Sequence, residues 1–167
     1  MGSAVREVKL RLMIPEAAYI RKENTVRDMQ LPGDVLMTKR SIMRWLALAL
    51  GLVSPKESRQ LMLYVFESLV NFHLKKKSPD IHEIVAQVKK STGKKSSENE
   101  ETLTKAVRYH LNYLQKQGII EREKGAYRFV VPSMSEDDDL ASCLEQAYVN
   151  NVNSAFQKIK KALKAYE

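Results

Sequence analysis

The sequence contains little cysteine, glycine and proline, and each shortage excludes a class of protein. Cys143 is the single cysteine in 167 residues, which excludes an intrachain disulfide framework and a multi-cysteine metal site. Six glycines and five prolines are too few for a turn-rich all-β fold. The longest apolar run covers only residues 45–53, whereas a membrane-spanning helix needs about 20 apolar residues. We therefore expect no association with a membrane.

Positive charge, in contrast, is abundant. The chain has 28 Lys+Arg against 20 Asp+Glu, a net charge of +8, and its 44% hydrophobic residues are enough to build a core. The charge is uneven, because residues 136–167 sum to −2 and residues 1–135 to +10. A basic excess favours a polyanionic or acidic partner. We expect a cytoplasmic location, or a nucleoid-associated one if the chain binds DNA.

The hydrophobic pattern predicts a mainly helical chain of the α+β class. Residues 5–14 alternate in polarity, as a strand does. Apolar residues three and four apart predict helices over residues 38–52, 54–75, 79–90, 97–117 and 136–166. The start signals include Ser54-Pro55-Lys56-Glu57 and Ser78-Pro79-Asp80, and Gly118 ends the fourth helix. Two short β-prone runs around Lys124-Gly125 predict a hairpin within residues 119–131.

This order divides the chain into three parts. Residues 1–53 form an N-terminal extension with a strand and a helix, residues 54–132 form the main domain, and residues 133–167 form a long C-terminal helix. The main domain has the order helix, helix, polar loop, helix, hairpin.

One stretch of the main domain has a more specific pattern. Leu103–Ile120 carries Val107, His110, Leu111 and Leu114, followed by Gly118-Ile119-Ile120. It resembles the recognition helix and first wing strand of the winged helix-turn-helix transcriptional regulators. Tyr127-Arg128-Phe129 resembles the returning wing strand. The resemblance covers about residues 57–132 and implies a winged-helix domain that binds duplex DNA.

A helix that reads DNA needs one face for packing and another for the major groove. Leu103, Val107, Leu111 and Leu114 supply the packing face. The other face offers Thr104, Lys105, Arg108, Tyr109 and Asn112. Arginine can read guanine, asparagine can read adenine, and lysine and tyrosine can contact phosphates.

Two further groups of basic residues are candidates for contact with the DNA backbone. The resemblance places Arg122, Lys124 and Arg128 near the wing tip, by the backbone or the minor groove. Lys94 and Lys95 belong to a lysine cluster over residues 75–95 with a local charge of +5. These lysines either contact phosphates or act as solubilising surface charges.

Three carboxylates oppose the DNA interpretation. Glu98, Glu100 and Glu101 precede or begin the presumed reading helix, where they would repel phosphates. The alternative is a winged-helix module that binds protein, as a subunit of a larger assembly. A third interpretation, binding of single-stranded nucleic acid, requires stacking aromatic residues. Tyr109 and Tyr127 are the candidates for that role.

The C-terminal helix carries an apolar series at three- and four-residue spacing. It comprises Leu144, Tyr148, Val152, Phe156, Ile159 and Leu163. This series either packs on its own domain, for example against the helix at 39–51, or pairs with a second copy. We expect a homodimer, because DNA-binding dimers place two reading modules on two half-sites.

The sequence contains few candidate catalytic residues. His73, His82 and His110 lie on different predicted helices, and the chain lacks a His-Glu-x-x-His motif and a glycine-rich phosphate loop. His110 falls with the apolar residues of its helix, which favours a packing role. We expect no enzyme activity, no metal and no cofactor.

Overall fold

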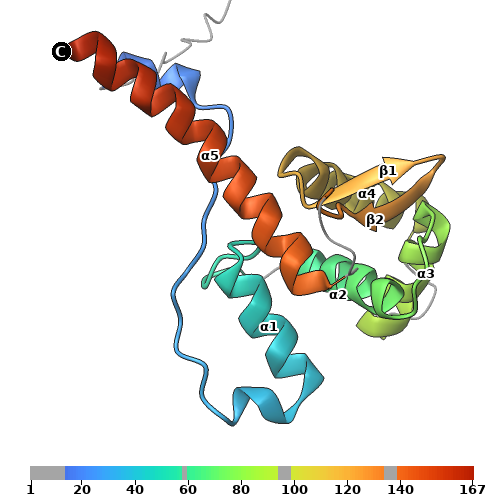
Figure 1. Ribbon diagram of the computed structural model, residues 1–167. Coiled ribbons are helices and arrows are strands. Elements are labelled where there is room, and N and C mark those ends of the chain that lie inside the picture. Colours follow the sequence, from blue (N-terminus) through green and yellow to red (C-terminus); the bar gives the residue numbers. More distant parts are fainter. Residues whose placement is uncertain (1–13, 58–59, 94–98, 134–138) are drawn as a thin grey trace, which may run out of the picture.

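The computed structural model describes residues 14–57, 60–93, 99–133 and 139–167 (Figure 1). The strand expected over residues 5–14 lies outside these ranges except for Ile14, as do Lys94, Lys95 and Glu98. The elements are η1 (Pro15–Tyr19), η2 (Val35–Met37), α1 (Lys39–Ala49), α2 (Leu61–Leu74), α3 (Ile81–Thr92), α4 (Glu100–Lys116), β1 (Ile120–Glu123), β2 (Ala126–Phe129) and α5 (Leu140–Tyr166). The expected α+β class is confirmed, since helices dominate and β1 pairs with β2 in an antiparallel sheet. Within the described ranges, none of these helices combines the length and the apolar character that a bilayer crossing requires.

Helix α2 lies at the centre of the core. It contacts α1, α3, α4 and β2, and both Val65 and Phe66 are 0% exposed. The Phe66 ring meets the edge of Phe129 in β2 at a centroid distance of 6.2 Å, which joins α2 to the hairpin. The sequence predicted this position, because α2 is apolar around most of its circumference.

The start of α2 differs from the prediction. Ser54 and Glu57 form a turn, in which the Ser54 amide donates to the Glu57 carboxylate at 3.0 Å, but the helix begins only at Leu61. Residues 54–57 are exposed. A capping signal without an apolar face to bury does not extend into a helix, because helix nucleation is costly.

The other helix ends follow ordinary capping chemistry. Asp80, rather than Ser78, caps α3, and it forms a capping box with Glu83. Asn99 caps α4, where its side chain accepts a hydrogen bond from the Glu101 amide at 3.1 Å. The predicted start of α3 was therefore early by two residues, because Asp80 satisfies the free amides better than a serine followed by proline.

The hairpin matches the sequence prediction closely. Glu123 pairs with Ala126, so that Lys124 and Gly125 form a two-residue turn, with φ of 50° and 81°. Two positive φ values are typical of the type I′ turn that suits the twist of a hairpin. The Tyr127 amide donates to the Pro79 carbonyl oxygen at 2.8 Å. This bond ties β2 to the segment that leads into α3.

The first half of α5 packs within the chain. Cys143 and Ala147 are buried, and Leu144 and Tyr148 pack against the core. The Tyr148 hydroxyl donates to the Leu50 carbonyl oxygen at the end of α1. Burial, with a smaller contribution from Tyr113, raises the pKa of Tyr148 to about 12, so that the hydroxyl keeps its proton. Figure 1 shows the second half of α5 running away from the α2–α4 body.

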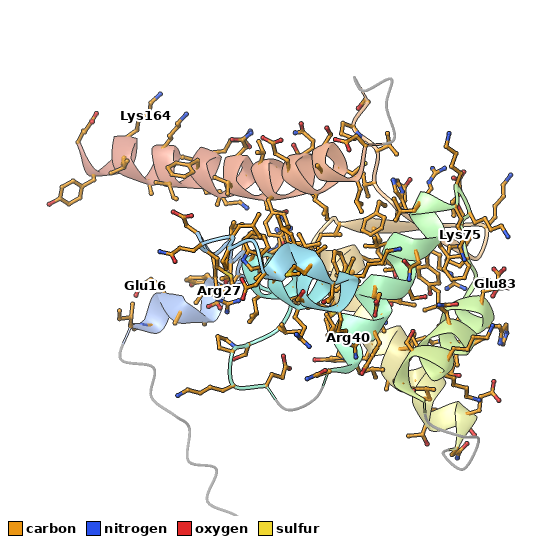
Figure 2. The ribbon with its side chains drawn as sticks, turned by 90° about the horizontal axis from the view of Figure 1, so that it is seen from below. Glu16, Arg27, Arg40, Lys75, Glu83 and Lys164 are labelled. Carbon is orange, nitrogen blue, oxygen red and sulfur yellow. The ribbon has the colours of Figure 1, made fainter. Side chains whose placement is uncertain are left out.

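The segment before α1 is held in place by Arg27. Its guanidinium donates to the carbonyl oxygens of Leu48 at 2.6 Å and Val53 at 3.2 Å, and its amide donates to Ala49 at 2.8 Å. A cation is favourable at the C-terminus of a helix, where the carbonyl groups are unpaired. Figure 2 shows Arg27 beside α1.

One buried hydroxyl group is unsatisfied. Ser68 is 1% exposed, and its Oγ has no hydrogen-bond partner among the described residues. Replacing Ser68 with Ala removes this group and improves helix propensity. We expect Ser68→Ala to raise the free energy of unfolding by about 1 kcal/mol. Urea titration checks this, and a lower unfolding midpoint would show that the hydroxyl is satisfied in solution.

Candidate nucleic-acid interface

Helix α4 has a packed face and an outer face. Val107, Leu111 and Leu114 are 0% exposed and form the packed face. The outer face, defined here as Lys105, Arg108, Tyr109 and Asn112, is exposed. At about 100° of rotation per residue, the two sets point in opposite directions from the helix axis. The structure therefore brings four of the predicted site residues together on one exposed surface.

The fifth residue predicted on α4, Thr104, is placed differently. Its side chain is half-buried, and its hydroxyl donates to the Glu100 carbonyl oxygen at 2.8 Å. Threonine hydroxyl groups on helices often form this bond to the preceding turn. Thr104 thus lies beside the outer face rather than on it.

The polar side chains of the outer face differ in whether another described residue pairs with them. Lys105 forms an ion pair with Glu101 at 3.2 Å, one helical turn earlier. No hydrogen bond or ion pair joins the Arg108 or Asn112 side chain to another described residue. Tyr109 is 72% exposed and its ring meets the edge of His110. Among the described residues, Arg108 and Asn112 thus differ from Lys105, which is paired with a carboxylate.

His110 lies beside this face, between the exposed and the packed residues of α4. It is half-buried, and burial lowers its pKa, a shift that the carboxylate of Glu57 partly opposes. The imidazole is therefore held toward its neutral form, and it adds no positive charge to the surface at neutral pH.

The three basic residues predicted near the hairpin tip are in two different states. Lys124 is exposed at the turn, and Arg122 lies with its guanidinium 5.4 Å from the ring centroid of Tyr127. Arg128 instead bonds Glu121 at 2.6 Å and Glu123 at 2.8 Å. The hydrogen bond and charge of Glu121 raise the pKa of Arg128 further. The positive charge of Arg128 is thus offset by two carboxylates, while Lys124 at the tip forms no ion pair with another described residue.

The strand register explains this pairing. Glu121 lies opposite Arg128, and Glu123 lies two residues further along the same strand. Side chains of a strand alternate between faces, so that the three charged groups share the exposed face of the hairpin. The two-residue spacing of Glu121 and Glu123 places them on one face of the strand, and the register with β2 then brings Arg128 between them.

Two further residues of α4 lie in line with the outer face: Lys116, which sequence reasoning missed, and Glu101, which it named only as a source of repulsion. Glu101 and Lys116 are both exposed and lie at helical spacing from Lys105 and Asn112. The intervals of four residues, from Glu101 to Lys105 and from Asn112 to Lys116, identify them from the sequence. Glu100 lies beside this surface and forms an ion pair with Lys89 of α3 at 3.2 Å.

The six residues predicted for dimerisation fall into two groups. Leu144 and Tyr148 pack on the core of the same chain. Val152, Phe156, Ile159 and Leu163 are 45–60% exposed on the half of α5 that leaves the body. Packing within the chain therefore uses Leu144 and Tyr148, whereas the other four are not among the described residues that pack against the core.

Comparisons of the chain with protein-family models, with curated proteins and with solved structures gave no match. Within the described ranges, the histidine, cysteine and acidic side chains do not form a group of three or more that can hold a metal ion. The case for a function therefore depends on the geometry of α4 and the hairpin.

Proposed function

We propose that residues 54–132 form a winged-helix domain that binds duplex DNA, within a homodimeric transcriptional regulator. In this proposal α4 is the reading helix and the β1–β2 hairpin is the wing. The order α2, α3, α4, β1, β2 supports it, as does the packing of α4 against both α2 and α3. A helix about 10–12 Å across fits a major groove about 12 Å wide.

The observation that carries the proposal is the contrast between the two faces of α4. The packed face is closed by Val107, Leu111 and Leu114, whereas the Arg108 and Asn112 side chains on the outer face have no hydrogen-bond partner among the described residues. These are the side-chain types that form paired hydrogen bonds with guanine and adenine. Lys105 and Lys116 on the same face can contact phosphates.

Arg108→Ala tests this assignment. We expect about tenfold weaker binding to a preferred duplex, because a paired contact to a base is worth about 1–3 kcal/mol. Arg44→Ala, which removes an exposed arginine from α1, is the matched control and should bind like the wild type. Gel shifts over a series of salt concentrations should show log K falling by about 0.9 per phosphate neutralised.

Two results would reject the proposal. One is the absence of duplex binding at low salt; the other is equal loss of affinity in the Arg108→Ala and Arg44→Ala variants. A single-stranded probe of the same sequence belongs in the same experiment. Tighter binding to that probe would favour stacking on Tyr109 and Tyr127 instead.

Charge compensation on the surface favours a second candidate, a winged-helix module that binds protein. Lys105 and Arg128 are both paired with carboxylates, and Glu100 and Glu101 lie at the start of α4. A protein interface tolerates such mixed charges better than a DNA backbone does. This candidate predicts DNA binding that is weak or absent, and a stoichiometric protein partner recovered with the chain.

A further inference from the structure

Helix α5 has two apolar faces, and among the described residues only one of them packs against the core. The covered face lies in the first half of the helix, where Cys143 and Ala147 are buried and Leu140, Leu144 and Tyr148 pack against the core. It attaches the helix to the body of its own chain.

The second face is an apolar stripe along the half of α5 that leaves the body. It consists of Val149, Val152, Phe156, Ile159, Leu163 and Tyr166, with exposed fractions of 41%, 45%, 51%, 45%, 60% and 92%. At about 100° per residue, the centre of this stripe is rotated by about 120° from the centre of the covered face. The contacts that bury the first half of α5 therefore cannot extend along the helix to cover the stripe.

Residues 19–24 of the N-terminal segment do not cover it either. The Lys22 ammonium donates to the Asn151 side chain at 2.7 Å, and the Asn151 amide donates to the Gln117 carbonyl oxygen at 2.8 Å. These bonds hold residues 19–24 across a groove of about 1220 Å³ on the side of α5 that continues the covered face. Ile159 lies at the edge of that groove, and the other stripe residues lie outside it.

We propose that a second copy of this chain covers the stripe, with the two α5 helices antiparallel. The intervals between the six stripe residues are three, four, three, four and three. This series is the same from either end, which is the requirement for self-pairing about a two-fold axis. An axis between residues 157 and 158 places Val149 against Tyr166, Val152 against Leu163 and Phe156 against Ile159 of the second copy.

The charges on α5 favour the antiparallel direction over the parallel one. Lys158, Lys160, Lys161 and Lys164 gather near its C-terminal end, and Figure 2 shows Lys164 near that free end. A parallel pair brings these four lysines of one copy next to the same four lysines of the other copy. In the antiparallel pair they lie alongside residues 151–157, which contain no charged side chain. The antiparallel arrangement thus avoids a like-charge repulsion that the parallel arrangement creates.

The size of the stripe is sufficient for a stable dimer. From the exposed fractions, its six side chains offer on the order of 700 Å² per copy. Pairing two copies removes up to roughly 1,400 Å² from water, within the range of about 1,200–2,000 Å² for specific interfaces.

This pairing rests on the proposed function, in which the chain is a homodimer, and it specifies how the two copies meet. It also determines the distance between their two bodies. The two Cys143 positions, where α5 joins each body, lie 29 residues of helix apart, or about 43 Å. Adjacent DNA half-sites are separated by about 34–36 Å per turn. The two bodies thus lie at opposite ends of the helix pair, at a separation comparable with that of two half-sites.

The first test is the oligomeric state of the full chain. Sedimentation over a range of concentrations should show a dimer for the wild type. Phe156→Asp should raise the dimer Kd by roughly a hundredfold or more, because it places a carboxylate at the centre of the interface. Ser154→Asp adds the same charge on the opposite side of the helix and should leave the Kd unchanged. A wild-type monomer, or a dimer unaffected by Phe156→Asp, would overturn the proposal.

Disulfide formation tests the direction of the helices. In a Cys143→Ala background, a mixture of Val152→Cys chains and Leu163→Cys chains should form cross-linked dimers. Neither variant alone should do so, because an antiparallel pair separates identical positions that lie away from the axis. Efficient cross-linking of Val152→Cys with itself would indicate a parallel pair and reject the antiparallel one.

Failure of this inference and failure of DNA binding give different results. Arg108→Ala should remain a dimer while it loses affinity for DNA. Phe156→Asp should become monomeric, keep its helical circular dichroism and bind a single half-site weakly. A dimer that does not bind DNA would leave the α5 pairing intact and reject only the DNA-binding function.

Discussion

The Phe66→Ala variant is expected to lose about 3–5 kcal/mol of unfolding free energy. Phe66 is 0% exposed on α2, and its ring meets Phe129 of β2 at 6.2 Å in an edge-to-face contact. Truncation removes the transfer free energy of the ring and leaves a cavity, and it also breaks the link between the central helix and the hairpin. The loss is a large fraction of the 5–15 kcal/mol that is usual for a small protein.

Chemical denaturation measures this loss. The midpoint of unfolding should fall in Phe66→Ala, while the slope with denaturant stays the same if the transition remains two-state. Tyr109→Ala is the control, because Tyr109 is 72% exposed on α4 and its removal should change stability by less than about 0.5 kcal/mol. A loss below about 1 kcal/mol in Phe66→Ala would show that α2 and the hairpin are not packed as described.

The elements that the sequence predicted well are those in which local signals and core packing agree. Val107, Leu111 and Leu114 repeat at helical spacing and are all fully buried in α4. At the hairpin, Lys124-Gly125 supplies the positive φ values that the turn requires. In both places a short stretch of sequence contains the physical cause of the structure, so that little depends on distant residues.

The features that the sequence did not predict depend on partners far away in the chain. The Ser54-Glu57 signal forms its turn but no helix, because residues 54–57 meet no apolar surface. On α5, the apolar spacing identified a stripe but did not show which residues pack against it. Tyr148 finds its partner at Leu50, about 100 residues earlier, whereas Phe156 stays exposed. Apolar periodicity shows that a face needs cover, and only the tertiary structure shows which part receives it.

The same limit applies to the candidate interface. The sequence placed Lys105, Arg108, Tyr109 and Asn112 on one face of a helix, and the structure has them there. It did not reveal that Arg128 lies between two carboxylates, because that contact depends on the register of β1 and β2. A sequence does not show whether a cation is paired with a carboxylate. A paired cation attracts a phosphate less strongly than an unpaired one does.

The acidic start of α4 provides the sharpest test of the DNA-binding function. Glu100 and Glu101 have a structural reason to be there, since carboxylates stabilise a helix N-terminus and these two pair with Lys89 and Lys105. The end of a reading helix that faces the groove lies close to phosphates. At about 10 Å and an effective dielectric constant of about 20, each carboxylate repels a phosphate by about 1–2 kcal/mol.

We therefore expect the Glu100→Gln, Glu101→Gln double variant to bind duplex DNA on the order of a hundredfold more tightly at low salt. The gain should shrink as salt is added, because screening weakens the repulsion that the change removes. Glu16→Gln, Glu23→Gln is the control, since it removes two exposed carboxylates before α1 and should bind like the wild type apart from a small effect of net charge. Figure 2 shows Glu16 on the side of the molecule away from α3, which packs against α4. Equal affinities for the two double variants would mean that the start of α4 does not face DNA. That result would make the mixed charges of this surface evidence for the protein-binding module.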